Sequence, residues 1–302
     1  MDLGQIYSPV AVELQAVDRK IKSQRETLCG DSVLVDTIFQ SFFKTSGKKL
    51  RPSLVILSAF ALRQDNMRSS KDSAVYDNLI SLATITELVH CASLMHDDVL
   101  DAALTRRDQP SLNAQFGDKI AILGGDMLYS QAFEILAAVA DRDIIRMLAR
   151  CVRGMCRGEV SNLSDHDFNG YLGVIEDKTA SFMEFCCRAG ALLAGSGEED
   201  RGKVESLAKF GYHFGMVYQL VDDLGDCDDV VAMTSMEDVL LNLDRHILDA
   251  GKHLAEVPDS IYKASLSKLL HFVASKRECP ADTGCFEKTG VGHREAVVGS
   301  MR

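Results

Sequence analysis

The chain has 302 residues, of which 46% are apolar and 25% are charged, so it has enough apolar side chains for a large core. Lys and Arg number 33 against 44 Asp and Glu, and the net charge of −11 argues against a nucleic-acid-binding protein, since phosphate affinity requires clustered basic residues. Nine cysteines without a dense framework and an N-terminus without a basic region predict a cytoplasmic protein with no secretory signal. No stretch reaches the ~18 uncharged apolar residues that a transmembrane helix needs.

Apolar residues recur at helical spacing along most of the chain. Within residues 82–92, 135–140 and 207–221 they stand one, three or four positions apart, and no repeated alternation of Val, Ile and Thr indicates strands. None of the five prolines lies between Pro110 and Pro258, which favours long helices because proline disrupts helix interiors. The pattern predicts an all-α fold.

The domain organisation follows from the same pattern. No long polar segment divides the chain, so we expect one helical domain over residues 1–277. Residues 278–302 are rich in Gly and polar side chains and lack an apolar period, which predicts a flexible C-terminal tail.

A first acidic cluster follows the apolar run 82–92. Asp97 and Asp101 stand four residues apart, so a helix places them on one face about 6 Å apart, with Asp98 a quarter turn away. Like charges repel at this spacing, and acids are unfavourable at the C-terminal end of a helix. A solvated helix end is one interpretation, and a bound cation that removes the repulsion is the other.

A second cluster, Asp222, Asp223 and Asp226, follows the nearly uncharged run Phe210–Val221. One such cluster is more often solvated surface, but two clusters that each follow an apolar helix are a more specific signal. If the two helices face each other, a divalent cation would stabilise the converging carboxylates, and oxygen ligands favour Mg2+ or Mn2+. Because Mg2+ usually completes its coordination with water and phosphate, the pattern predicts a phosphorylated ligand.

Basic residues near these clusters could bind a diphosphate. Arginine forks and lysine point charges are the usual phosphate ligands, although each residue alone is more often a surface charge. The candidates are Lys48, Lys49, Arg51, Arg106, Arg107 and Lys178.

Together these motifs resemble the trans-isoprenyl diphosphate (polyprenyl) synthase family, medium- or long-chain type, over roughly residues 40–230. The resemblance is carried by GKKLRP at 47–52, ELVHCASLMHDDVLD at 87–101, RR at 106–107, FGDKIAILGGD at 116–126, GE at 158–159, KTASF at 178–182 and FGMVYQLVDDLGD at 214–226. It implies a single isoprenoid-synthase-like helical domain around a central cavity, with the two acidic clusters facing across its mouth. It also implies a homodimer.

The resemblance further implies a Mg2+-dependent prenyltransferase that also tolerates Mn2+. An allylic diphosphate would ionise, isopentenyl diphosphate would attack the cation, and a proton would be lost. The implied metal ligands are Asp97, Asp101 and Asp222, with Asp98, Asp223 and Asp226 acting directly or through water. Arg106, Lys178, Thr179 and Gln219 would hold the allylic diphosphate, and Lys48, Arg51, His90 and Arg107 would hold isopentenyl diphosphate. The implied catalytic residues are Asp97, Asp101, Asp222, Arg106 and Lys178, which would stabilise charge on the leaving diphosphate.

Two small residues before the first cluster bear on product length. In the family, large aromatic side chains at the positions of Ala92 and Ser93 shorten the product, so small ones leave the shaft open. This implies a product of about C30 or above, because side-chain size limits what a pocket admits.

The two main departures of the sequence from the family pattern lie after the paired arginines and around Asp226. Asp108 and Gln109 replace the usual Gly and Lys after the paired arginines, and there is no lysine between Lys209 and Lys252 in the segment around Asp226. A catalytically weak subunit of a heteromeric synthase is therefore an alternative. Others are a terpene synthase and, from the doublet His96–Asp97, an HD-type phosphohydrolase.

Overall fold

The computed structural model describes residues 2–44, 47–63, 73–164, 167–195, 197–225 and 234–277. In this part of the chain almost all secondary structure is helical, and the one sheet pairs two strands of two residues each. The prediction of an all-α fold is confirmed. Residues 278–302 lie outside the described residues, so the flexible tail and the domain bounds stay predictions.

Helices follow one another along the chain, interrupted by one short hairpin. In chain order the elements are α1 (Leu3–Tyr7), η1 (Ser8–Val10), α2 (Ala11–Cys29), α3 (Val33–Phe42), α4 (Leu50–Arg63), α5 (Ser73–Leu100), β1 (Thr105–Arg106), β2 (Gln109–Pro110), α6 (Leu112–Phe116), α7 (Asp118–Val139), α8 (Arg142–Asn162), α9 (Phe168–Ile175), η4 (Glu176–Ala180), α10 (Ser181–Ala194), η5 (Glu198–Asp200), α11 (Arg201–Gly225), α13 (Met236–Ala255) and α14 (Ile261–Ala274).

Several of these helices begin where the sequence supplies a capping side chain. At each of these positions a Ser or Asp oxygen accepts a hydrogen bond from a backbone N–H of the first turn, which would otherwise have no partner. The capping residues are Ser32, Asp141, Asp167, Ser235 and Ser260. Each such cap contributes about 1 kcal/mol to helix stability.

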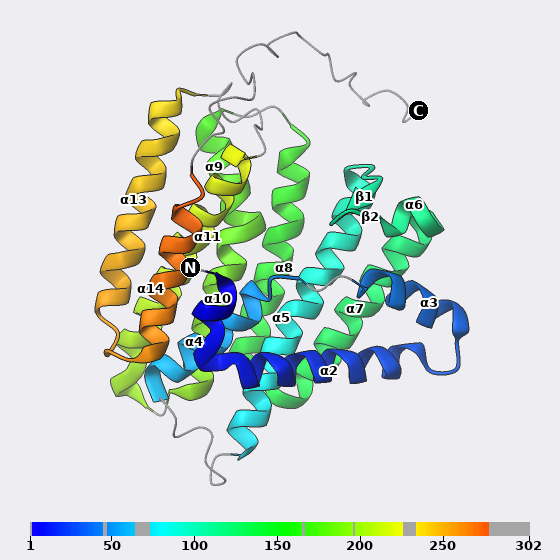
Figure 1. Ribbon diagram of the computed structural model, residues 1–302, viewed down its shortest axis with the longest axis horizontal. Coiled ribbons are helices and arrows are strands. Elements are labelled where there is room, and N and C mark those ends of the chain that lie inside the picture. Colours follow the sequence, from blue (N-terminus) through cyan, green and yellow to red (C-terminus); the bar gives the residue numbers. More distant parts are fainter. Residues whose placement is uncertain are drawn as a thin grey trace.

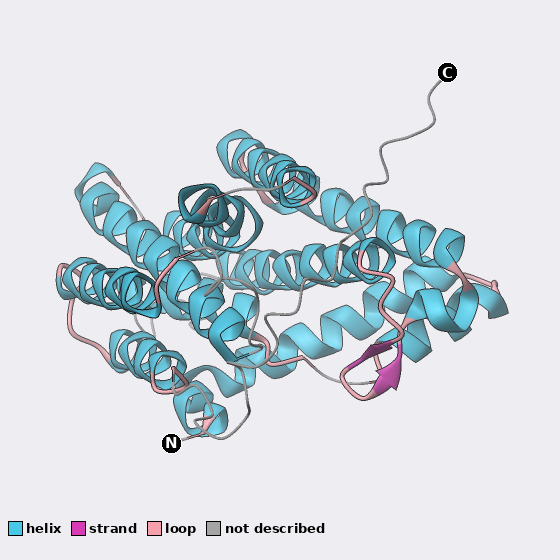
Figure 2. Cartoon of the chain, turned by 90° about the horizontal axis from the view of Figure 1, so that it is seen from above, coloured by secondary structure: helices cyan, strands magenta, loops and turns pink. Residues whose placement is uncertain are grey.

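The long helices form a bundle in which α5 is central. Helix α5 packs against α7 and α4, α10 packs between α4 and α11, and α11 packs against α13. In Figure 1, α2 crosses one end of the bundle instead of running along it, and α13 and α14 lie on the side away from α3 and α6. Figure 2 shows the β1–β2 hairpin protruding from the helical body. One connected hydrophobic core extends from Ile6 in α1 to Val273 in α14.

Close packing of α10 on α4 depends on a missing side chain. A Cβ added to Gly190 would lie 2.2 Å from the backbone oxygen of Val55, a distance that only a shift of one helix could relieve. The two helices can therefore approach this closely only because position 190 is glycine.

We expect Gly190→Ala to lower the free energy of unfolding by about 3 kcal/mol, because the added methyl group separates α10 from α4. Gly251→Ala is the matched control: it lies within α13, where an added Cβ would meet nothing within 4 Å. It should stabilise the protein by about 0.5–1 kcal/mol through helix propensity. Urea unfolding of both variants measures the difference, and equal stabilities would contradict the packing argument.

Two helices are long and apolar enough to span a membrane by length and composition alone, namely Ala74–Leu100 in α5 and Asp118–Val139 in α7. The core helix of a folded domain passes the same test, and 78% of the α5 window is buried inside the structure. Only 39% of the α7 window is buried, and Ile122 and Leu123 are 43% and 57% exposed. Helix α7 therefore presents an apolar face that the described residues do not cover.

Candidate active site

The first acidic cluster lies at the C-terminal end of α5, where its sequence position predicts it. Asp97 is half-buried, Asp101 follows the last residue of the helix and is exposed, and Asp98 is only 1% exposed. Burial, followed by the charge of Glu159, raises the pKa of Asp97 to about 7, although Lys178 and Arg106 oppose the shift. Asp97 thus faces groups on α8 and η4, which is the direction of the second cluster.

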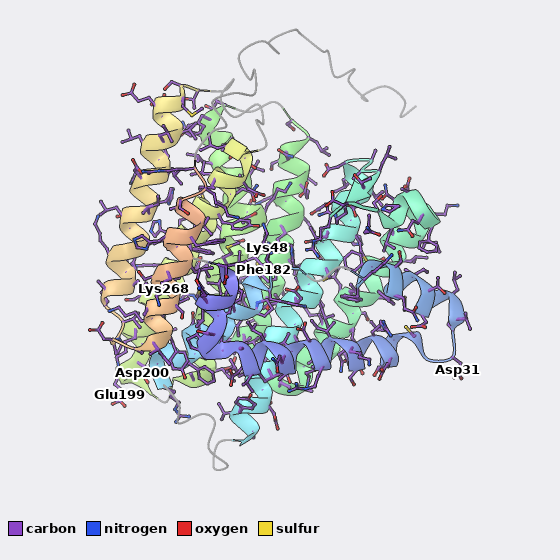
Figure 3. The ribbon with its side chains drawn as sticks, viewed as in Figure 1. Asp31, Lys48, Phe182, Glu199, Asp200 and Lys268 are labelled. Carbon is purple, nitrogen blue, oxygen red and sulfur yellow. The ribbon has the colours of Figure 1, made fainter. Side chains whose placement is uncertain are left out.

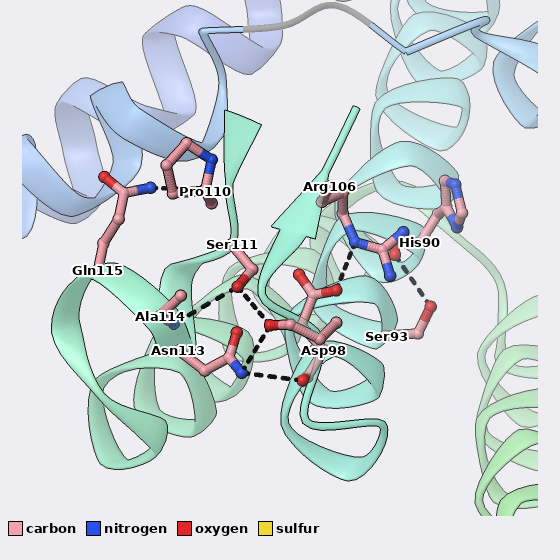
Figure 4. A network of polar contacts seen from close by, with 10 residues as sticks. His90, Ser93, Asp98, Arg106, Pro110, Ser111, Asn113, Ala114 and Gln115 are labelled. Carbon is pink, nitrogen blue, oxygen red and sulfur yellow. Dashed lines mark hydrogen bonds and ion pairs between the residues drawn. The ribbon is translucent and has the colours of Figure 1, made fainter. Parts of the chain in front are cut away.

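The side chain of Asp98 binds the hairpin. Its carboxylate accepts a 2.6 Å hydrogen bond from Arg106 Nε, and its backbone oxygen accepts one of 3.0 Å from the side chain of Asn113 (Figure 4). Burial raises the pKa of Asp98 while Arg106 lowers it. The buried ion pair fixes the guanidinium of Arg106 beside the end of α5. Whether Asp98 also binds metal stays a prediction.

The hairpin turn requires an unusual backbone conformation. Arg106 pairs with Gln109, and the two residues between them, Arg107 and Asp108, have φ angles of +52° and +59°. Two left-handed residues at the centre of a two-residue loop are typical of a type I′ turn, which favours Gly, Asn and Asp. Asp108 is therefore compatible with the turn, although glycine would adopt it at lower cost.

We expect Asp108→Gly to raise the free energy of unfolding by about 1 kcal/mol, because a left-handed conformation costs an L-residue about that much and glycine almost nothing. Thermal unfolding measures the gain. Gln109→Ala, in the adjacent strand position with negative φ, is the control and should produce no gain. An unchanged or lower melting temperature for Asp108→Gly would contradict the turn assignment.

Lys178 reaches the site from the π-helical turn η4, which packs on α8. A Cβ on Gly158 would lie 2.7 Å from Lys178 Cγ, so glycine at this position lets η4 approach α8. The neighbouring Glu159 carboxylate lies 2.5 Å from Lys178 Nζ. This contact gives the Gly–Glu pair of the sequence motif a physical meaning: the glycine makes room for the lysine and the glutamate pairs with it.

The second acidic cluster lies at the end of α11. Asp222 is exposed, Asp223 is 9% exposed, and Asp226 lies outside the described residues. Gln219 Nε2 donates to Asp223 Oδ1 at 2.7 Å, and Thr179 Oγ1 donates to Gln219 Oε1 at 2.9 Å. The structure therefore brings together Thr179 and Gln219, two of the four residues that the resemblance assigns to the allylic diphosphate.

Consecutive residues of η4 connect the two clusters. The charge of Lys178 acts on Asp97 of α5, while Thr179 is bonded through Gln219 to Asp223 of α11. Neighbouring residues of η4 thus interact with the ends of both α5 and α11.

The residues expected to hold isopentenyl diphosphate gather next to this centre. The Nδ1 atom of His90 and the Nε atom of Arg51 are buried without a hydrogen-bond partner. Burial, followed by the charges of Arg51, Arg107, Arg106 and Lys49, lowers the pKa of His90 well below its usual value, so its ring is neutral. Buried polar atoms without partners are uncommon in folded proteins, so the hydrogen bonding of the protein alone is incomplete at this position.

Arg51 and Lys48, two of the residues expected to hold isopentenyl diphosphate, have different surroundings. The guanidinium carbon of Arg51 lies 5.3 Å from the centre of the Phe182 ring, and Figure 3 shows Phe182 and Lys48 near the middle of the bundle. Lys48 is exposed, whereas Lys49 is engaged by Asp18 at 2.9 Å and by Glu87 at 3.6 Å. Lys48 is therefore the more accessible lysine of the pair.

The doublet His96–Asp97 does not form a joint site. His96 Nε2 lies 3.1 Å from the backbone oxygen of Ile122 and 3.5 Å from Asp126, both on α7. The contacts of His96 are thus with α7 and not with Asp97, which argues against the phosphohydrolase alternative.

Carboxylates suit a divalent cation, but they do not form a complete cage. Within the described ranges, no three His, Cys, Asp or Glu side chains are grouped closely enough to hold a metal ion alone. Mg2+ is usually held by one or two carboxylates together with water and substrate phosphates, so this donor set fits Mg2+ bound with a diphosphate. A pocket of about 30 Å³ beside Arg106 and Arg107 has room for only about two water molecules and does not fit that ligand.

Comparison with known proteins points to one family. The profile of the polyprenyl synthetase family matches residues 32–235. The chain is 30% identical over 263 residues to a decaprenyl-diphosphate synthase from Dictyostelium discoideum. The aligned region covers 85% of this chain and 55% of that protein. It is 31% identical over 231 residues to an octaprenyl diphosphate synthase from Haemophilus influenzae, with 75% and 65% covered. The chain thus spans less than two thirds of the length of these relatives.

Two solved structures are similar in fold. A polyprenyl synthase from Caulobacter crescentus, complexed with calcium and isoprenyl diphosphate, matches with a TM-score of 0.79 and 23% identity over 92% of this chain and 98% of that chain. A decaprenyl diphosphate synthase from Rhodobacter capsulatus matches with a TM-score of 0.76 and 22% identity over 92% of this chain and 100% of that chain.

Tyr171 is a residue of the site that sequence reasoning missed. It lies on α9, and its hydroxyl donates a hydrogen bond to Asp223 Oδ2. A tyrosine seven residues before Lys178 belongs to none of the motifs that carry the family resemblance, so only the folding of α9 against α11 reveals it.

Proposed function

The chain belongs to the polyprenyl synthetase family, and from this premise we propose that it is a Mg2+-dependent prenyltransferase. It condenses isopentenyl diphosphate with an allylic prenyl diphosphate and releases a longer all-trans polyprenyl diphosphate of medium or long chain. The proposal rests on the position of η4. Its Lys178 interacts with the first acidic cluster, and its Thr179 is hydrogen-bonded through Gln219 to Asp223 of the second cluster.

The allylic diphosphate is held between α5, the hairpin and η4. Lys178 and Arg106 stabilise the negative charge that grows on the diphosphate as its bond to carbon breaks, so they bind the transition state more strongly than the substrate. When bound, Mg2+ held by Asp97, Asp101 and Asp222 supplies further charge neutralisation. Asp98 keeps Arg106 in place through its buried 2.6 Å hydrogen bond.

Isopentenyl diphosphate occupies the adjacent space between α4 and α5. Arg51, Arg107 and Lys48 supply positive charge there, and neutral His90 supplies a ring nitrogen that has no protein partner. No side chain of the set has to act as a strong base, because the released diphosphate can accept the proton lost in the last step.

A second copy of the chain would cover the exposed apolar face of α7. Ile122 and Leu123 lie on that face, and uncovered apolar surface of this kind marks association sites. The homodimer therefore belongs to the proposal. Light scattering after gel filtration tests it, with twice the chain mass expected.

The cytoplasmic location also remains a proposal. The six cysteines of the described segments are all free, as a reducing compartment would allow.

One assay tests the activity. Purified chain is mixed with Mg2+, labelled isopentenyl diphosphate and a series of allylic primers, and the extracted products are resolved by length. We expect extended diphosphates, and none when a chelator removes the metal. Failure to extend any primer, while inorganic diphosphate still binds, would reject the synthase and favour the weak-subunit alternative.

A further inference from the structure

Resting on the proposed function, we propose that Tyr171 is a positioning residue: its hydroxyl orients Asp223, and through it Gln219 and Thr179, so that this side of the site is preorganised for the allylic diphosphate. Tyr171 is 6% exposed and its ring stacks on Phe168, with centroids 5.9 Å apart and planes inclined by 20°. The stacking limits the rotation of the ring, so the hydroxyl is held in one place.

Asp223 receives hydrogen bonds from two sides. Tyr171 donates to Oδ2, and Gln219 Nε2 donates to Oδ1 at 2.7 Å. Because each carboxylate oxygen has its own donor, the plane of the carboxylate is fixed. The neighbouring Asp222 is exposed, so the two acids of the pair have different surroundings although they are the same residue type.

The orientation of Asp223 determines that of Gln219. With its NH2 group directed to Asp223, Gln219 turns its Oε1 atom to Thr179, whose hydroxyl donates to it at 2.9 Å. Thr179 is adjacent to Lys178 in η4. Networks in which every member has a partner are rigid, so the tyrosine hydroxyl acts on the diphosphate site through two intervening side chains.

Tyr171→Phe removes only the hydroxyl and keeps the stacked ring. We expect the KM for the allylic diphosphate and the Mg2+ concentration for half-maximal rate to rise about tenfold, the size expected for one hydrogen bond to a charged group. The KM for isopentenyl diphosphate should stay unchanged, because Arg51 and His90 lie on α4 and α5. Calorimetry should show about tenfold weaker binding of inorganic diphosphate with Mg2+, independently of turnover.

Tyr212→Phe is the matched control. Tyr212 OH of α11 donates to Glu176 of η4 at 3.2 Å, so it too forms a tyrosine–carboxylate bond between α11 and a neighbouring element, but in an exposed position. This variant should equal wild type in every measurement. A loss as large as that of Tyr171→Phe would show that any tyrosine–carboxylate bond at α11 has this effect, and would overturn the proposal.

The action through Asp223 is tested by a double-mutant cycle. Asp223→Asn should weaken allylic and diphosphate binding, and adding Tyr171→Phe should cause no further loss, because the two residues act in series. If Tyr171→Phe alone fails to fold, Asp223→Asn must still affect the allylic substrate selectively. Additive losses, or equal losses for both substrates, overturn the proposal.

Failure of this inference can be told apart from failure of the proposed function. A wild type that extends primers while Tyr171→Phe matches it in the allylic KM and in diphosphate binding overturns the role of Tyr171 alone. A wild type without turnover refutes the proposed function, whereas the calorimetric comparison still decides whether Tyr171 organises the diphosphate site.

Discussion

The Asp97→Asn variant is expected to turn over at least about 1000-fold more slowly than wild type, equivalent to about 4 kcal/mol of lost transition-state stabilisation. Asp97 is the half-buried acid of the first cluster that faces Lys178 and Glu159. Asparagine has the same shape but no charge, so it removes the cation ligand without changing the packing of α5. Single-turnover kinetics with saturating substrates and Mg2+ measure the loss of the chemical step directly.

Asp143→Asn is the control for this experiment. Its carboxylate is 81% exposed in the first turn of α8 and lies 3.7 Å from Arg146. Turnover should therefore stay at the wild-type value. If Asp97→Asn kept more than about a tenth of wild-type turnover, a difference of only about 1.4 kcal/mol, Asp97 could not be a principal metal ligand.

The same carboxyl group makes a pH dependence part of this prediction. Burial and Glu159 raise the pKa of Asp97 to about 7, so the group is neutral below this pH and charged above it. A cation binds the charged form, and below pH 7 it must displace a proton. The Mg2+ concentration for half-maximal rate should therefore rise about tenfold per pH unit below 7 and level off above it. A requirement that is constant from pH 6 to pH 8 would contradict this assignment.

Ser93→Phe is expected to shorten the product, with the main chain length falling by one or more isoprene units. Ser93 is four residues before Asp97, so both lie on the same face of α5, and its hydroxyl donates only to the backbone oxygen of His90 at 2.9 Å. A phenyl ring at this position would occupy the space into which the product tail grows from the diphosphate site. Chromatography of dephosphorylated products measures the length.

Ala92→Phe tests the adjacent face of α5, which contacts α7 instead of the diphosphate site. Ala92 is fully buried, and His96, four residues later on the same face, contacts α7. A phenyl group at position 92 would press against α7, so we expect a loss of about 2 kcal/mol in stability from overpacking instead of a clean change in product length. A shorter product from Ala92→Phe and an unchanged one from Ser93→Phe would reverse this assignment.

Much of the site was predictable from local pattern. The spacing of Asp97 and Asp101 after an apolar run predicted two acids at a helix end, and the structure places them at the end of α5. Spacing could not separate the roles of adjacent acids. Asp98 is buried against Arg106 because the hairpin folds back on α5, and Asp223 is bonded to Tyr171 because α9 places this side chain beside the end of α11. Burial of one member of each pair depends on residues distant in sequence.

The two departures from the family pattern differ in how far the structure explains them. At Asp108 the structure shows a left-handed turn that an aspartate can adopt, which local sequence alone did not reveal. The rewritten segment after Asp226 covers residues 227–254. Residues 227–233 lie outside the described residues and most of the remainder forms α13, so its effect on the rate is left to the activity assay.

By itself, the sequence determined the helical fold class and the family, together with the residue types of the site. Apolar periodicity specifies which face of each helix is buried, and the acidic and basic motifs are short enough to read from local sequence. Only the tertiary structure decided which side chains are paired and which remain accessible. It pairs Lys178 with Glu159, turns His96 to α7, leaves Arg51 and His90 with buried polar atoms that lack partners, and adds Tyr171 to the site. These outcomes depend on contacts between helices far apart in the chain, and such contacts leave no periodic signal in the sequence.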